Sequence, residues 1–157
     1  DVFKMGLVMM FTLPGSPGLY YGDEIGLPGW TDPDNRRPYP WGRETEEGLE
    51  ILQFTRELIK VYKNSTSLRR GSFDFIDWQK GYLAYASWNK EESIVTIVNR
   101  EEKVVEVEIP LWLLDKKKGE IEILFSTKEV DIKNKYYNEG RKNLKIPEKT
   151  AVIIKVN

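Results

Sequence analysis

The first 67 residues change several times between apolar and polar segments, and this pattern predicts helix, strand, loop and helix in succession. Val2–Leu13 is apolar on nearly every side apart from Lys4, which predicts a helix buried over most of its surface. Pro14-Gly15 would end this helix. The short apolar run Gly18–Tyr21 predicts a fully buried strand, bounded by Gly22. Because a helix without a polar face needs cover, we expect the chain to be a fragment of a larger protein.

A long loop and a second helix follow. The segment Trp30–Trp41 contains three prolines and predicts irregular structure, and long loops in compact domains are often functional. Glu44–Lys63 shows helical periodicity, with Thr45 as the expected N-cap. Apolar residues fill half of this helix's circumference, which is wider than the stripe of a typical surface helix. We therefore expect the helix to be clamped between two layers.

From Gly71 onward the hydrophobic pattern has period two, interrupted by turn-forming residues, which is typical of antiparallel strands. Six strands are clearly indicated, and two weaker candidates lie at 130–136 and 143–146. The sequence therefore predicts an α+β chain divided near Leu68, with residues 1–67 ending an α/β domain and residues 68–157 forming an antiparallel β-sandwich. The six strands are Phe73–Trp78, Tyr82–Trp88, Ser93–Asn99, Val104–Ile109, Ile121–Phe125 and Ala151–Val156.

Composition narrows the classes of function. There are 24 Lys and Arg against 25 Asp and Glu, which argues against a nucleic-acid partner. The apolar N-terminal run is shorter than the roughly 20 residues that a membrane span needs, so we expect no membrane partner. Cysteine and histidine are both absent, which excludes a disulfide framework, a thiolate nucleophile and His-ligated metals. We expect neither metal nor cofactor.

Composition and the N-terminal run also support expectations about heat adaptation and cellular location. It is rich in Lys, Glu and Ile and free of Cys, a composition seen in heat-adapted proteins. The apolar N-terminal run lacks a start Met and a small-residue cleavage site, so a signal peptide is disfavoured. We therefore expect a cytoplasmic location.

The adjacent pair Asp23-Glu24 follows the predicted strand, where functional side chains of a parallel α/β barrel are found. Adjacent side chains on an extended backbone point in opposite directions, so these two carboxylates cannot act as one pair. The structural alternative is that one carboxylate caps a turn while the other pairs with a basic residue.

The loop after Trp30 holds the best candidates for binding. Counted from Asp32, the spacing does not fit an EF-hand calcium loop, because Arg36 falls at a position that needs an oxygen ligand. The loop also contains Asp34 and Arg37, and an Asp–Arg ion pair among these four residues could stiffen it. Alternatively, Asp32 and Arg36 could present hydrogen-bonding groups to a polyhydroxylated ligand. Trp30 and Trp41 flank them, and aromatic faces beside polar groups suit sugars. Both interpretations remain open at this point.

Aromatic residues of the β-rich part are more typical of packing than of binding. Trp78, Tyr82, Tyr85 and Trp88 are candidates for the core or for contacts between domains. Tyr136-Tyr137 could instead form an exposed patch. A carbohydrate-binding role is the minor alternative for both sets.

Two motifs together resemble a known family. The string GSPGLYYGDEIGLPG, Gly15–Gly29, resembles the eighth-strand segment of the alpha-amylase family of glycoside hydrolases. The continuation DPDNRRPYPW, Asp32–Trp41, resembles the neopullulanase, cyclomaltodextrinase and maltogenic amylase branch. By this resemblance, Val2–Leu13, Gly18–Tyr21 and Thr45–Lys63 would be the last helix, strand and helix of a (β/α)8 barrel. Residues 71–157 would be its C-terminal antiparallel sandwich.

The resemblance implies a retaining hydrolase of alpha-glucans acting on α-1,4 glucosidic bonds, with α-1,6 bonds left open. The family's three catalytic carboxylates precede the matched region, so no residue of this chain is expected to be catalytic. A retaining glycosidase needs two carboxyl groups about 5–5.5 Å apart, and the chain alone is expected to be inactive. In this branch, residues matching Asp32 and Arg36 contact sugar on the donor side of the cleft. Trp30 and Trp41 are added on the residue argument alone.

Two other classes of function remain as alternatives. The chain could be a non-catalytic module that binds alpha-glucan. It could also be an interaction unit, in which the apolar faces of Val2–Leu13 and Ile51–Tyr62 are buried by self-association or by a partner chain. The expected partners are accordingly an alpha-glucan or maltooligosaccharide, and either the missing N-terminal barrel portion or a second copy.

Overall fold

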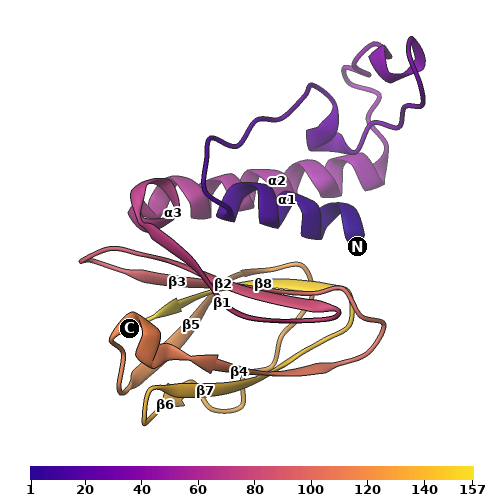
Figure 1. Cartoon of the computed structure of the whole chain (residues 1–157). Coiled ribbons are helices and arrows are strands. Elements are labelled where there is room, and N and C mark those ends of the chain that lie inside the picture. Colours follow the sequence, from indigo (N-terminus) through magenta and orange to yellow (C-terminus); the bar gives the residue numbers. More distant parts are fainter.

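The computed structural model describes all 157 residues, which form three stacked layers (Figure 1). The helical layer contains α1 (Val2–Thr12), α2 (Glu46–Asn64) and the short α3 (Thr66–Arg70). A six-stranded sheet lies beneath it, and a two-stranded sheet forms the third layer. Three 3-10 turns, η1 (Asp23–Ile25), η2 (Asp34–Arg36) and η3 (Leu111–Leu114), lie in the connections.

Every strand pairing is antiparallel. The large sheet has the order β1-β2-β3-β8-β5-β6, and β4 pairs with β7 in the small sheet. Figure 1 shows β4 and β7 side by side below the large sheet. The strands are β1 (Ser72–Gln79), β2 (Tyr82–Trp88), β3 (Ser93–Asn99), β4 (Val105–Pro110), β5 (Gly119–Ser126), β6 (Tyr136–Tyr137), β7 (Arg141–Ile146) and β8 (Thr150–Val156).

The six clearly indicated strands and the weaker one at 143–146 are therefore confirmed to within a few residues. The weaker strand at 130–136 is wrong, because only Tyr136-Tyr137 reaches the edge of β5 and pairs there. The residues before it bring Val130 and Ile132 to the hydrophobic core without joining a strand. Apolar side chains can thus reach a core from an irregular backbone. Alternation of apolar and polar residues alone therefore does not distinguish a strand from an irregular segment.

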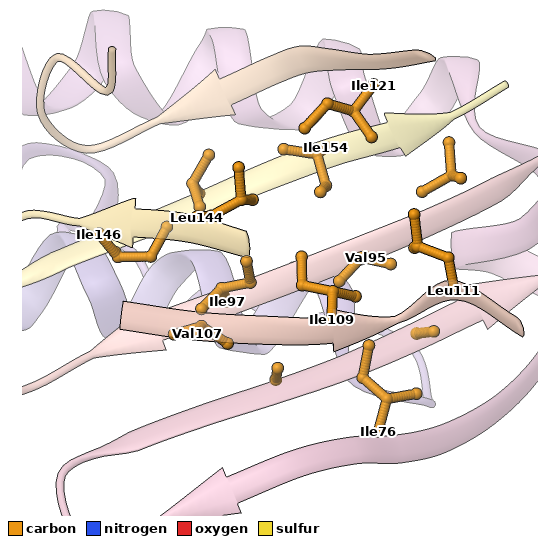
Figure 2. Packing of buried hydrophobic residues seen from close by; sticks show 14 of the residues in the cluster. Ile76, Val95, Ile97, Val107, Ile109, Leu111, Ile121, Leu144, Ile146 and Ile154 are labelled. Atoms are coloured by element: carbon orange, nitrogen blue, oxygen red, sulfur yellow. The ribbon is translucent and has the colours of Figure 1, made fainter. Parts of the chain in front are cut away.

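The large sheet is apolar on both faces because it is covered on both. Its lower face packs on β4 and β7, and Figure 2 shows Val107 and Ile109 of β4 beside Val95 and Ile97 of β3. Its upper face packs on the helical layer, with Ile94 of β3 among the residues buried there. All seven residues of β3 are consequently buried, as in central strands of doubly covered sheets.

The two long helices lie side by side on this upper face, as Figure 1 shows. The Thr45 hydroxyl accepts a hydrogen bond from the Gly48 N–H at 3.0 Å, so the predicted N-cap of α2 is confirmed. Leu58 of α2 and Val8 of α1 are fully buried between the helices and the sheet. The sheet of the same chain therefore covers part of both apolar faces, whereas Val2 and Phe3 of α1 stay exposed. Burial of these faces by a second copy or a partner chain stays a prediction.

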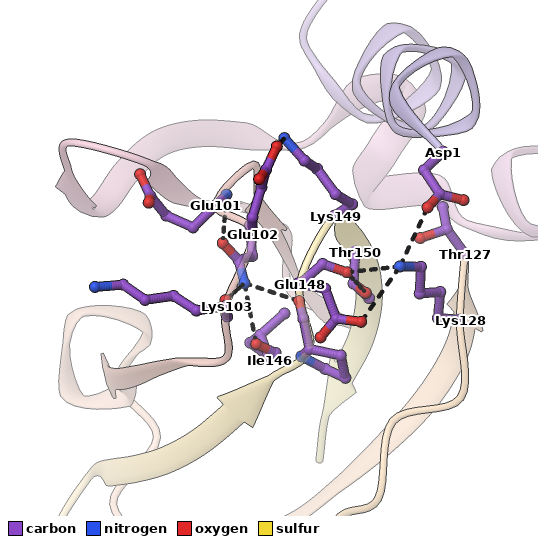
Figure 3. Close-up of polar contacts among 12 residues, drawn as sticks. Asp1, Glu101, Glu102, Lys103, Thr127, Lys128, Ile146, Glu148, Lys149 and Thr150 are labelled. Carbon is purple, nitrogen blue, oxygen red and sulfur yellow. Dashed lines mark hydrogen bonds and ion pairs between the residues drawn. The ribbon is translucent and has the colours of Figure 1, made fainter.

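Polar contacts also attach the helical layer to the sheet. The Tyr85 hydroxyl of β2 lies 2.6 Å from the Thr12 hydroxyl of α1. The Thr12 hydroxyl donates to the Val8 carbonyl, so Tyr85 is the donor to Thr12. Burial raises the pKa of Tyr85 to about 12, which keeps this donor protonated. At the other end of α1, Figure 3 shows Lys128 contacting Asp1, with their charged atoms 3.2 Å apart.

The predicted strand Gly18–Tyr21 is not formed. The segment has no strand hydrogen bonds, and the Tyr20 and Tyr21 side chains are exposed. A strand needs a neighbouring strand to satisfy its backbone N–H and C=O groups, and no other strand of this chain lies beside this segment. The chain therefore contains two long helices with an irregular connection between them. None of its helices has the length and apolar character needed to cross a membrane.

Candidate functional site

The candidate site is built on the segment between α1 and α2, which projects beyond the sandwich at the N-terminal end of α2 (Figure 1). The turn η1 anchors this segment through Ile25, which is buried against the first turns of α2. The approach is close: a Cβ added to Gly48 would lie 3.2 Å from the Ile25 carbonyl oxygen. This contact fixes the exposed loop after η1 at the N-terminal end of α2.

Asp23 and Glu24 are both used to shape the turn. Asp23 accepts a hydrogen bond from the Tyr20 N–H at 3.1 Å, and Glu24 accepts one from the Gly22 N–H at 2.7 Å. The expectation that a carboxylate of this pair caps the turn is therefore confirmed. The expected pairing of one of them with a basic residue is wrong, because each carboxylate accepts from the nearby backbone instead.

Asp32 and Arg36 meet across the turn η2. One Arg36 nitrogen lies 2.6 Å from an Asp32 carboxylate oxygen and donates to the other oxygen at 2.8 Å. The two side chains remain about 60% exposed (60% for Arg36 and 62% for Asp32). The ion-pair interpretation is therefore confirmed, and it does not exclude binding, because both groups keep free hydrogen-bonding positions that face solvent.

A second Asp–Arg pair braces the same turn. Arg37 donates to Asp34 in the two-pronged geometry, with distances of 2.8 and 2.9 Å. Asp34 also accepts from the Trp30 N–H at 2.9 Å. The hydrogen bond from Arg37 holds the pKa of the Asp34 carboxyl below its usual range. The i,i+3 spacing of an acidic and a basic residue was the available signal for this pair.

The two tryptophans of the loop present large apolar surfaces to solvent. Trp30 is 82% exposed and Trp41 is 79% exposed. Trp41 also contacts the Tyr39 ring, with the ring centroids 4.4 Å apart. Large apolar side chains usually pack in the core. The exposure of Trp30 and Trp41 shows that neither does so in this chain.

Taken together, the loop offers a carboxylate, a guanidinium and exposed aromatic rings on a braced turn. Such groups bind hydroxyls and the apolar faces of sugar rings. Asp23 and Glu24 are committed to backbone contacts, and no cluster of three or more acidic residues is placed to hold a metal ion. The arrangement therefore supports binding of a hydroxylated ligand.

The chain is similar to curated and solved proteins of one kind. It is 35% identical to a cyclomaltodextrinase of Geobacillus thermopakistaniensis over 129 residues, covering 76% of this chain and 22% of that protein. It is 33% identical to neopullulanase 2 of Thermoactinomyces vulgaris over 112 residues, covering 69% and 19%. The chain thus spans about a fifth of the length of these relatives. No protein-family model matches it.

The fold has close counterparts. The alpha-amylase of Geobacillus thermoleovorans, solved with acarbose, superimposes with a TM-score of 0.83 at 27% identity, covering 99% of this chain and 33% of that one. A debranching enzyme of Nostoc punctiforme gives 0.83 at 26% identity, covering 98% and 30%. The chain is therefore homologous to enzymes of the alpha-amylase family of glycoside hydrolases. More narrowly, its homologues are cyclomaltodextrinase, neopullulanase and maltogenic amylase, which confirms the branch expected from the motifs.

Proposed function

We propose that this chain is the C-terminal portion of a retaining alpha-glucan hydrolase that acts on α-1,4 glucosidic bonds, with α-1,6 bonds left open. In this proposal α1 and α2 are the last two helices of a (β/α)8 barrel. Residues 68–157 are then a separate sandwich domain. The catalytic carboxylates lie in the remaining part of the parent protein, and the chain alone is inactive.

The observation that carries the proposal is the Asp32–Arg36 pair on its braced, exposed turn. The pair lies in the motif that resembles the neopullulanase branch, and its two side chains are in contact. Asp32 would accept hydrogen bonds from sugar hydroxyls, while Arg36 would donate to hydroxyl oxygens. Trp30 and Trp41 would supply aromatic surfaces beside them.

The proposal is tested in the full parent protein with the substitutions Asp32→Asn and Arg36→Gln. Each should lower kcat/KM on maltooligosaccharides by roughly 10- to 100-fold, the range expected when a hydrogen bond to a charged group is lost. Glu108→Gln is the matched control, because Glu108 forms an equally exposed ion pair with Arg141 at 2.8 Å on the sandwich. That variant should retain the parent's kcat/KM.

The 157-residue chain alone should give no turnover on maltooligosaccharides, cyclodextrins or pullulan. Turnover that survives purification and is lost on Asp23→Asn or Glu24→Gln would contradict the assignment of the catalytic groups to the rest of the parent. Unchanged kinetics of both loop variants in an active parent would contradict the sugar-contact role of the loop.

A further inference from the structure

An exposed tryptophan lies on the small-sheet side of the sandwich. Trp112 belongs to η3, the turn that follows β4 and packs against β7. Two leucines of the same turn, Leu111 and Leu114, are buried in the core between the two sheets, and Figure 2 shows Leu111 there. Trp112 itself is 55% exposed. The leucines therefore anchor the turn, and the indole ring is presented to solvent.

Backbone hydrogen bonds hold Trp112 against the turn between β6 and β7. The Trp112 N–H donates to the Gly140 carbonyl at 2.9 Å, and the Gly140 N–H donates to the Lys117 carbonyl at 2.7 Å. A Cβ added to Gly140 would lie 2.8 Å from the Trp112 Cβ, so the close approach requires glycine. Two other segments of the chain thus fix the Trp112 backbone, and ligand binding would cost little ordering there.

Polar side chains surround the exposed ring in an open pocket of about 470 Å³. Trp112 is the single apolar residue of the lining, and the other lining residues are Lys117, Lys118, Asn138, Glu139 and Gly140. The four polar side chains take part in no hydrogen bond or ion pair within the chain, whereas the nearby Arg141 side chain pairs with Glu108 at 2.8 Å. Their donors and acceptors are therefore free to contact a ligand.

Glu139 has a backbone conformation that glutamate rarely adopts. The Arg141 N–H donates to the Asn138 carbonyl at 3.3 Å, and the two residues between them have φ values of 57° for Glu139 and 67° for Gly140. Two positive φ values mark a type I′ turn, whose central positions favour Asn, Asp or Gly. Glutamate is unfavourable here, and no hydrogen bond or ion pair of its side chain compensates. Contact of its carboxylate with a ligand would explain its presence.

We propose that Trp112, Glu139 and their polar neighbours form a surface site for a saccharide, with a sugar ring stacked on the indole. Glu139 and Asn138 would accept hydrogen bonds from sugar hydroxyls, while Lys117 would donate to hydroxyl oxygens. One aromatic ring is too small an apolar surface for a stable protein interface. A ring beside donors and acceptors of both charges suits a neutral polyhydroxylated ligand instead. The choice of an alpha-glucan as that ligand rests on the proposed function.

The indole N–H signals of the five tryptophans allow a residue-specific test by nuclear magnetic resonance. Maltoheptaose is titrated to millimolar concentration into the isotope-labelled 157-residue chain, and Trp112→Phe and Trp78→Phe assign the two signals of interest. The Trp112 signal should shift and saturate. Trp78 is the internal control, because it is 66% exposed and lines an open groove between α1 and the β1–β2 hairpin. Its signal should not move.

Two variants separate the ring from the carboxylate. Trp112→Ala should remove the saturable shift of the Gly140 amide signal. Glu139→Asn should weaken the affinity by roughly 3- to 10-fold, the range for one hydrogen bond. Its unfolding temperature should stay equal or rise, because asparagine is favoured at this turn position. Lys149→Asn is the matched control and should keep the affinity, because Lys149 also has a positive φ of 47° but pairs with Glu102 in another turn.

Several results would overturn the surface site. A Trp112 signal that does not move, or that moves no more than the Trp78 signal, would show that no saccharide stacks there. Unchanged affinity in Glu139→Asn would contradict the role of the carboxylate. Movement of the Trp112 signal with rising protein concentration and no sugar would favour self-association. An equal response to cellohexaose would contradict the choice of an alpha-glucan.

Failure of this site and failure of the proposed function give different results. A parent that hydrolyses maltooligosaccharides while the Trp112 signal stays unmoved contradicts the surface site and leaves the function standing. A saturable shift at Trp112 in a chain whose parent hydrolyses no alpha-glucan contradicts the function and supports the surface site.

Discussion

At the scale of single residues, the charged side chains of this protein mostly complete local backbone structure. Glu92 is the clearest case, since it links the junction of α2 and α3 to the start of β3. Its carboxylate accepts from the Ser67 N–H and from the Ser65 hydroxyl, both at 2.7 Å. Burial alone would raise the pKa of Glu92, but these hydrogen bonds outweigh it and hold the pKa below its ordinary value of 4.5. The ionised form is therefore bound more tightly in the folded state.

This depressed pKa predicts a dependence of stability on pH. Since the unfolded carboxyl takes up its proton first, Glu92 contributes stability above about pH 4.5 that is lost as the pH falls through the lower folded value. Glu92→Gln should lower the free energy of unfolding at pH 7 by about 1 kcal/mol and weaken the loss of stability on acidification. Denaturant titrations from pH 7 to pH 3 measure both effects.

The neighbouring exposed residue Glu91 provides the control. Glu91→Gln removes the same charge without removing the hydrogen bonds to the α2–α3 junction. An equal change in the acid dependence of both variants would show that general charge, and not this bonding, is responsible.

Residue spacing predicted part of the candidate site. Asp32 and Arg36 are four residues apart, and their pairing follows from the turn between them. Asp34 and Arg37 were candidates for an ion pair in the same loop, and the structure shows that they form a second pair. The exposure of Trp30 and Trp41 could not be derived from the sequence. The residues next to a tryptophan in the chain do not show whether another segment of the protein covers it.

At the scale of elements, a helix or strand could be predicted from the sequence when the hydrogen bonds that stabilise it lie within its own segment. α2 was predicted with its cap, because helical hydrogen bonds and the Thr45 cap lie within one segment. The segment Gly18–Tyr21 was predicted as a strand and is irregular, because strand hydrogen bonds need a second segment. The short helix α3 and the turn η3 were not predicted, since each spans only about one turn and carries little periodicity.

The packing of α2 on the sheet predicts different costs for two leucines of the same helix. Leu58 is fully buried among the helices and the sheet, whereas Leu49 is half exposed. Leu58→Ala should lower the free energy of unfolding by about 3 kcal/mol through lost burial and a residual cavity. Leu49→Ala should lower it by no more than about 0.5 kcal/mol. Urea unfolding of both variants compares them, and equal losses would contradict the packing described for this helix.

At the scale of the whole molecule, two hydrophobic cores share one sheet. The lower core is built entirely from residues between Ile76 and Val156. The upper core combines helical residues such as Val8 and Leu58 with sheet residues such as Ile94 and Ile153. The predicted boundary near Leu68 falls inside α3, and the upper core contains residues from both sides of it.

This arrangement predicts how a truncated chain would behave. Residues 68–157 alone should keep the lower core, so amide protons of β4 and β7 should stay protected from exchange. The upper face of the sheet would lose its cover, exposing Ile94, Val98 and Ile153. The truncated protein should therefore bind an apolar fluorescent dye and self-associate in sedimentation, unlike the complete chain. A monomeric truncated protein that binds no dye would contradict the need for the helical layer.

The amino-acid sequence was sufficient to predict the two long helices, the cap of α2 and the alternating strands, and its motifs indicated the alpha-amylase family. These depend on residues close together in the chain. The folded structure was needed to show that Gly18–Tyr21 is irregular, that one sheet covers apolar side chains of both α1 and α2, and that a groove stays open beside α1. Those outcomes depend on which distant segment lies against each surface, because burial and strand pairing are satisfied between elements and not within them.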